Sequence, residues 1–184
     1  MEGMQKLKKL SSEASAEIHR IMADTSIFGV SETCDNILMW SHYAENHTGA
    51  VVEFRVVQEV DSSLLMAQPV RYSQEIPHLS YDLMLMDSRK ARMEILDILT
   101  LSKSEVWAYE KEWRVWSSLR DKTQSFEIIP FAPEEIGAVY LGCKMSDTDK
   151  TQITGIIRSK YSSAKVFAAE KHPSRFELVF NKLP

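Results

Sequence analysis

Residues 137–168 decide the fold class; they read GAVYLGCKMSDTDKTQITGIIRSKYSSAKVFA. The apolar run at Gly137–Gly142 predicts a strand, residues 147–161 have the pattern of a helix, and Val166–Ala168 predicts a second strand. Two parallel strands need a crossover connection, usually a helix, and this spacing provides one. The stretch therefore predicts a strand-helix-strand unit with parallel strands.

The sequence on the N-terminal side of this unit adds antiparallel pairing. Residues 50–57 alternate Val52, Phe54 and Val56 with charged side chains, which predicts a half-buried strand. Residues 113–129 resemble neighbouring antiparallel strands. Further helices are predicted over residues 7–22, 36–45 with Asp35 as cap, and 81–101, and further strands over residues 27–30, 69–72, 126–129 and 176–180. We expect an α/β (α+β) fold in one domain, residues 1–184, with a mixed, mostly antiparallel sheet flanked by helices.

The amino-acid composition and the net charge disfavour several classes of function. The 184 residues are 44% hydrophobic and 26% charged, as in folded soluble proteins, and the net charge of −4 does not favour nucleic-acid binding. Cys34 and Cys143 lie far apart, without the spacing of a disulfide scaffold or a zinc site. The sequence shows no signal peptide and no apolar run long enough to span a membrane. We therefore predict a cytoplasmic protein without a metal site.

One candidate ligand-binding segment lies between a predicted helix and a predicted strand. It contains Trp40, His42, Tyr43 and His47, whose side chains could act in acid–base chemistry, hold a phosphate or carboxylate, or stack on a flat ring. The two histidines are five residues apart, about 140° around a helix, which disfavours a shared metal ion. Alternatively, Trp40 and Tyr43 pack the helix onto the sheet and His47 caps its C-terminus.

A second candidate segment, residues 107–116, interleaves tryptophans with Glu110, Glu112 and Arg114. In a strand, these three charged residues share one face, where two close carboxylates and an arginine suit acid–base chemistry or phosphate binding. In a helix, Glu110 and Arg114 form an exposed pair that contributes only a few tenths of a kcal/mol. The sequence leaves both alternatives open.

Two motifs carry a family resemblance. Residues 36–49, NILMWSHYAENHTG, and residues 107–114, WAYEKEWR, with the predicted strand 69–72 between them, resemble the bacterial and phage domain-of-unknown-function family 2971 over roughly residues 27–142. Members of this family usually begin with an additional strand and helix and an Asn-Asp-Pro-like segment, and this sequence is expected to start after them. The resemblance implies a setting in abortive infection or other phage-conflict genes.

A further similarity suggests a chemistry. Glu110-Lys111-Glu112 resembles the paired glutamates of ADP-ribosyltransferases, in which the second glutamate stabilises the positive charge that develops on the ribose. This resemblance implies an enzyme for a nucleotide-like ligand, with NAD as a possible cofactor, Glu112 and Glu110 as catalytic residues, and Trp40, His42, Tyr43, His47 and Arg114 as ligand-binding residues. The alternative is a non-catalytic module that binds a protein partner, as an antitoxin or regulatory partner does. The enzyme hypothesis requires the two segments to converge in space.

Overall fold

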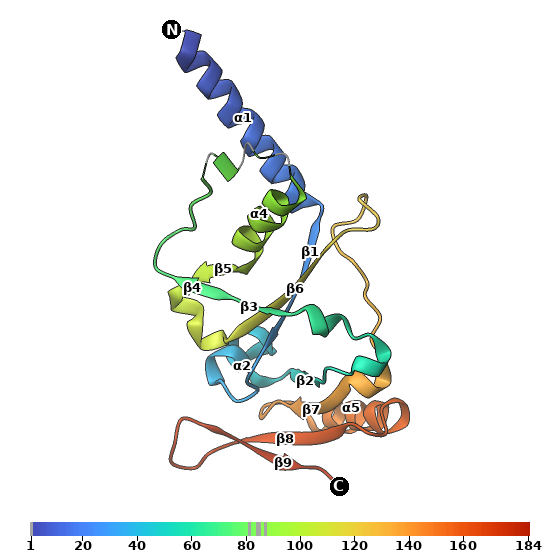
Figure 1. Ribbon diagram of the computed structural model, residues 1–184. Helices are drawn as coiled ribbons and strands as arrows, with labels where there is room; N and C mark the ends of the chain where they lie inside the picture. The colour runs from blue at the N-terminus through green and yellow to red at the C-terminus, as the bar shows by residue number, and fades with distance from the viewer. Residues whose placement is uncertain (1, 81, 84–85, 87) are drawn as a thin grey trace. The chain divides into compact units, whose positions relative to one another are not determined.

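The computed structural model describes residues 2–80, 82–83, 86 and 88–184. Its contacts divide the chain into two compact units: unit 1 comprises Met1–Val30 and Ala67–Ile129, and unit 2 comprises Ser31–Met66 and Pro130–Pro184 (Figure 1). In chain order the main elements are α1 (Glu2–Ala23), β1 (Thr25–Ser31), α2 (Ile37–Tyr43), β2 (Ala50–Phe54), β3 (Gln68–Pro69), β4 (Arg71–Ser73), α4 (Arg89–Leu101), β5 (Ser102–Ser104), β6 (Glu112–Ser118), β7 (Ile136–Leu141), α5 (Asp147–Lys160), β8 (Lys165–Lys171) and β9 (Leu178–Lys182).

Unit 2 is built on a four-stranded sheet in the order β2-β7-β8-β9. β7 and β8 are parallel and α5 connects them, which confirms the predicted crossover; the β2–β7 and β8–β9 pairs are antiparallel. Val139, Leu141 and Ile157 lie in one core cluster, which packs α5 against the sheet (Figure 1). Trp40 of α2 belongs to a second cluster with Leu178, and Tyr140 packs against that cluster. The sheet is therefore covered by a helix on each face, because successive residues of β7 point to opposite sides.

Unit 1 contains a three-stranded sheet in the order β1-β6-β3 and a two-stranded parallel sheet of β4 and β5. The helix α4 begins at its cap Ser88, whose side chain accepts a hydrogen bond from the Ala91 amide, and it leads directly into β5. At its other end, Thr100 and Leu101 are buried. Both units mix helices with strands, and the antiparallel strand pairs outnumber the parallel one in unit 2, so the predicted α/β class is confirmed.

Several predicted elements need correction, and the strand predicted over residues 50–57 ends at Phe54. Residues 126–129 form no strand, and the neighbours of β6 are β1 and β3, so the antiparallel pair predicted within residues 113–129 is wrong. The predicted strand 69–72 is divided at the buried Val70 into β3 and β4, which pair with different strands. The helix predicted over residues 81–101 is too long, because Met86 is irregular and α4 begins at Arg89; residues 81, 84–85 and 87 lie outside the described residues.

The helix α2 is capped by Asn36 and not by Asp35. The Asn36 side chain accepts hydrogen bonds from the Leu38 and Met39 amides at 2.9 and 3.2 Å, so it satisfies two donors that a helix start leaves open. The Asp35 carboxylate instead accepts a hydrogen bond from the Thr33 hydroxyl. The helix also ends earlier than predicted, at Tyr43.

Candidate functional site

Trp40 is a core residue of unit 2. Its side chain is 1% exposed, and its indole N–H donates to the Cys34 carbonyl at 2.7 Å. The Phe180 ring lies 6.2 Å away at a tilted angle. A side chain enclosed in this way fixes α2 to the sheet, as the packing alternative predicts, and it has no open ring face that could stack on a ligand.

A left-handed turn follows α2. Glu45, Asn46 and His47 have φ angles of 49°, 53° and 71°, although none of them is glycine. For L-residues this conformation costs roughly 1–2 kcal/mol each. Backbone hydrogen bonds hold the turn: the Gly49 amide donates to Ala44 at 2.9 Å and the Lys144 amide donates to His47 at 3.0 Å. The strain is therefore maintained by the chain on both sides of the turn.

This turn sets the position of the His47 ring. The ring lies parallel to the indole of Trp40, and its Nε2 is 3.1 Å from the Ser41 hydroxyl, while its buried Nδ1 has no hydrogen-bond partner among the described residues. Burial and the positive charges of Lys144 and Lys171 lower the pKa of His47. The ring is thus held neutral at pH 7, and because α2 has already ended, His47 does not cap that helix.

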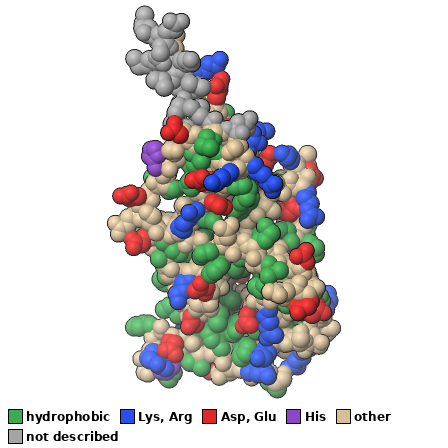
Figure 2. All heavy atoms as spheres, viewed as in Figure 1, with side chains coloured by type: hydrophobic (Ala, Val, Ile, Leu, Met, Phe, Trp, Pro, Cys, Tyr) green, Lys and Arg blue, Asp and Glu red, His purple; other side chains and the backbone are tan. Residues whose placement is uncertain are grey.

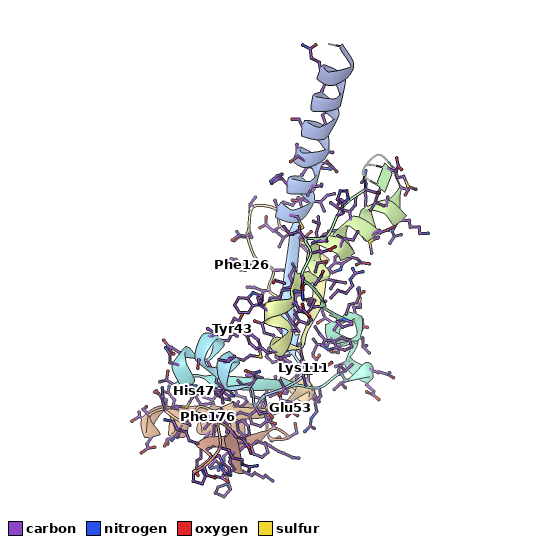
Figure 3. The ribbon with its side chains drawn as sticks, turned by 90° about the vertical axis from the view of Figure 1, so that its left-hand side faces the viewer. Tyr43, His47, Glu53, Lys111, Phe126 and Phe176 are labelled. Atoms are coloured by element: carbon purple, nitrogen blue, oxygen red, sulfur yellow. The ribbon has the colours of Figure 1, made fainter. Side chains whose placement is uncertain are left out.

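His42 and Tyr43 lie apart from this stack. Both side chains are exposed, and their rings meet edge to face at 6.2 Å; Figure 3 labels Tyr43 and His47. Only Trp40 and His47 of the four predicted ligand-binding residues in this segment therefore form one group. Tyr43 does not pack the helix onto the sheet.

The second segment forms a compact charge network in unit 1. Arg114 donates two hydrogen bonds to the Glu112 carboxylate, from Nε at 2.7 Å and from Nη2 at 2.9 Å. Lys103 Nζ donates to Glu112 Oε2 at 3.0 Å and also to Glu110. All four side chains are at most 20% exposed. Two acids and two bases thus neutralise each other.

Backbone geometry explains how the two glutamates meet. Glu110 ends a 3₁₀ helix (Glu105–Glu110) and Glu112 begins β6, while Lys111 between them has a positive φ of 45°. The strand alternative is thus correct for Glu112 and Arg114, which share a face, whereas Glu110 precedes the strand and shares the Lys103 ammonium with Glu112. A Cβ added at Gly29 would lie 2.7 Å from Glu112 Oε1, so β1 passes directly beside this carboxylate.

Sequence reasoning missed Lys103 and Tyr72. The Tyr72 hydroxyl accepts a hydrogen bond from the Glu112 amide at 2.8 Å, and the Lys103 ammonium lies 5.2 Å from the centre of the Trp107 ring. Both residues lie on the short strands β4 and β5, outside the two motifs. No local pattern marked them, because Tyr72 comes from a distant segment and a 3₁₀ helix separates Lys103 from Glu112.

Electrostatics favour the charged forms of Glu112 and Lys103. Burial acts to raise the pKa of Glu112, but hydrogen bonds from Arg114 and Lys103 outweigh it, and the pKa lies below its ordinary value. For Lys103, burial acts to lower the pKa, but the two glutamates outweigh it and the pKa is raised. The cations that could receive a phosphate of NAD are thus already bound to carboxylates.

The two predicted segments belong to different units, residues 40–49 to unit 2 and residues 107–116 to unit 1. Their convergence in one site stays a prediction. Within the described residues, no group of three or more His, Cys, Asp or Glu side chains is placed to hold a metal ion. None of the helices in this part of the chain combines the length and apolar character that a membrane span needs.

Comparison with known proteins supports the resemblance seen in the sequence. Searches against curated proteins and against solved structures both give no significant match. A family model does match, and the matched region includes both the Trp40–Gly49 and the Trp107–Arg114 segments. Residues 39–115 are thereby confirmed as similar to the family described as "Protein of unknown function (DUF2971)".

Proposed function

We propose that this chain is a non-catalytic protein-interaction module and that residues 126–129 of unit 1 are its contact segment. The observation that carries the proposal is the exposure of Phe126, Ile128 and Ile129, at 58%, 80% and 37%. Large apolar side chains concentrated in one short exposed segment are typical of interaction sites. Hydrophobic side chains also lie open elsewhere on the face drawn in Figure 2.

The segment has the sequence of a strand but lies outside every strand of the structure. An extended segment of this kind can add to the sheet edge of another protein, where its main chain gives affinity and alternate side chains give specificity. In this mode Phe126 and Ile128 point to one side and enter the partner. The opposite side includes Glu127, whose carboxylate already accepts a hydrogen bond from the Arg120 amide at 2.9 Å.

The charge network supports this proposal over catalysis. Both carboxylates of the paired-glutamate motif are occupied by Lys103 and Arg114 within unit 1. Breaking such a pair to bind a substrate would leave a charge poorly compensated, which is costly in a largely buried position. The family resemblance implies a phage-conflict setting, in which the module would act as an antitoxin or regulatory partner.

Site-specific photo-crosslinking in the native cells tests the interaction. A benzophenone side chain at position 128 is expected to crosslink to one defined protein, and Phe126→Ser is expected to remove that product. Position 176 is the matched control, since Phe176 is 99% exposed but lies in unit 2, between β8 and β9; Figure 3 labels Phe126 and Phe176. Absence of a defined product at position 128, or the same product from position 176, would overturn the proposal.

A second candidate function is an enzyme that acts on a nucleotide-like ligand at Glu112. The lowered pKa keeps Glu112 ionised, as a residue that stabilises a developing positive charge must be. The Trp107 and Tyr109 rings, 6.0 Å apart, lie beside the network through Lys103. This candidate requires Arg114 or Lys103 to exchange a glutamate for a ligand.

A thermal-shift screen with nucleotides, NAD included, distinguishes the two functions. The enzyme predicts a ligand-induced rise in Tm that Glu112→Gln and Glu110→Gln remove. The control is Glu17→Gln, which removes an exposed ion pair of α1. No shift with any nucleotide, together with a crosslink at position 128, would favour the interaction module.

A further inference from the structure

A second polar cluster, separate from the predicted segments, lies on the sheet of unit 2. The Tyr140 hydroxyl donates to Glu53 Oε2 at 2.6 Å, and Arg55 Nε lies 3.9 Å from Glu53 Oε1. The cluster comprises Glu53, Arg55 and Tyr140.

The charged side chains of this cluster are more exposed to solvent than those of the network in unit 1. The side chains of Glu53 and Arg55 are 40% and 46% exposed. The Arg55 guanidinium makes one long hydrogen bond, at 3.4 Å to the Gly137 carbonyl, and a carboxylate has about four acceptor positions, of which Tyr140 occupies one. A carboxylate and a guanidinium with spare hydrogen-bonding capacity therefore stand side by side, half-exposed.

A β-bulge holds these two groups in place. The partner of Glu53 in β7 is Ala138 and the partner of Phe54 is Ile136, so Gly137 is an extra residue in β7. Bulges of this kind redirect side chains and occur frequently beside functional sites. A Cβ at Gly137 would lie 2.5 Å from Glu53 Oε1 and 2.6 Å from Arg55 Nε, so both charged side chains lie over the glycine and would have to shift if a larger residue stood there.

Tyr140 orients the carboxylate. Its ring stacks on Phe167 at 5.1 Å and meets Phe180 edge to face at 5.1 Å, which fixes the position of the hydroxyl. Burial and the hydrogen bond to Glu53 raise the pKa of Tyr140, so the hydroxyl stays a donor at neutral pH. One carboxylate oxygen is thereby anchored and the group cannot turn freely.

We propose that Glu53 and Arg55 form a binding site for a planar polar group that presents N–H donors beside a carbonyl oxygen. The carboxylate would accept from the N–H groups and the guanidinium would donate to the carbonyl. A guanine base and a carboxamide such as nicotinamide share this chemistry. The site is independent of the contact segment at residues 126–129.

NMR titration of the full chain with guanosine monophosphate and with nicotinamide tests this site. At least one of them is expected to shift the Gly137 amide and Tyr140 ring signals, with a dissociation constant of about 0.1–1 mM for so exposed a site. Inosine monophosphate lacks the guanine amino group and is expected to bind at least about fivefold more weakly than the guanosine compound. The compound that binds identifies the source of the group, base or carboxamide.

Three variants complete the test. Glu53→Gln and Arg55→Ala are each expected to weaken binding by about tenfold. Both residues are partly exposed, so two independent variants guard against the failure of one to fold. Glu170→Gln, an exposed acid on β8, is the control and is expected to bind like the wild type. The proposal would be overturned if neither compound shifts these signals at millimolar concentration, or if Glu53→Gln and Arg55→Ala both bind as tightly as the wild type.

Discussion

The imidazole ring of His47 lies parallel to the indole ring of Trp40, with ring centres 6.3 Å apart and an interplanar angle of 6°. A left-handed turn of three non-glycine residues brings the imidazole to this position. Strain of this kind persists only where the surrounding structure enforces it, and it gathers at functional sites. The stack therefore links a costly backbone conformation to a neutral, half-buried histidine.

The stack predicts a loss of stability in weak acid. Burial, Lys144 and Lys171 lower the pKa of His47 in the folded chain, whereas an unfolded histidine titrates near 6.5. The unfolded chain therefore binds the proton first, and stability falls as the pH drops below about 6.5. In urea unfolding from pH 8 to 5, His47→Gln is expected to lose less stability on acidification than the wild type. The control is the exposed His42→Gln, and equal pH dependence of His47→Gln and the wild type would contradict this assignment.

Two glycines of unit 2 predict opposite effects of the same substitution. Gly155 lies in α5, where an added Cβ has no neighbour within 4 Å, so Gly155→Ala is expected to raise the free energy of unfolding by about 0.5–1 kcal/mol. At Gly142 the Cβ would lie 2.1 Å from the His47 carbonyl oxygen, so Gly142→Ala is expected to destabilise the chain by at least about 2 kcal/mol. Urea unfolding of both variants measures this; a neutral Gly142→Ala would show that the left-handed turn yields easily.

Local sequence patterns predicted the strand-helix-strand unit of unit 2, but they did not predict the side-chain contacts around Glu112 in unit 1. The crossover through α5 was predictable because apolar periodicity distinguishes its strands from its helix. The network around Glu112 was not, because Lys103 meets Glu110 and Glu112 across a 3₁₀ helix that ends at the left-handed residue Lys111. Residues 126–129 were predicted as a strand from their local sequence, but they form none, because a strand also needs a neighbouring strand to pair with and the local sequence does not determine that pairing.

Lys111 predicts a stabilising substitution. Its φ of 45° is unfavourable for lysine, so Lys111→Gly is expected to raise the free energy of unfolding by up to about 1 kcal/mol. The matched control is Glu94→Gly, an exposed position inside α4, where glycine is expected to cost about 1 kcal/mol. The Tm of the two variants should therefore move in opposite directions. A fall in Tm for Lys111→Gly would show that the lysine side chain itself stabilises unit 1.

The Glu112 network predicts an acid-dependent contribution to stability. Glu112→Gln leaves Arg114 and Lys103 partly unpaired in a largely buried position, which is expected to cost about 2–4 kcal/mol at pH 7, whereas Glu17→Gln in an exposed pair is expected to change the free energy of unfolding far less. The pKa of Glu112 is lowered from 4.5, so its contribution is complete above that pH and is lost as the pH falls through the folded-state pKa. Urea unfolding between pH 7 and 3 should therefore show the gap between the wild type and Glu112→Gln closing with acidification. A gap that stays constant over this range would mean that Glu112 stabilises unit 1 by its shape and not by its charge.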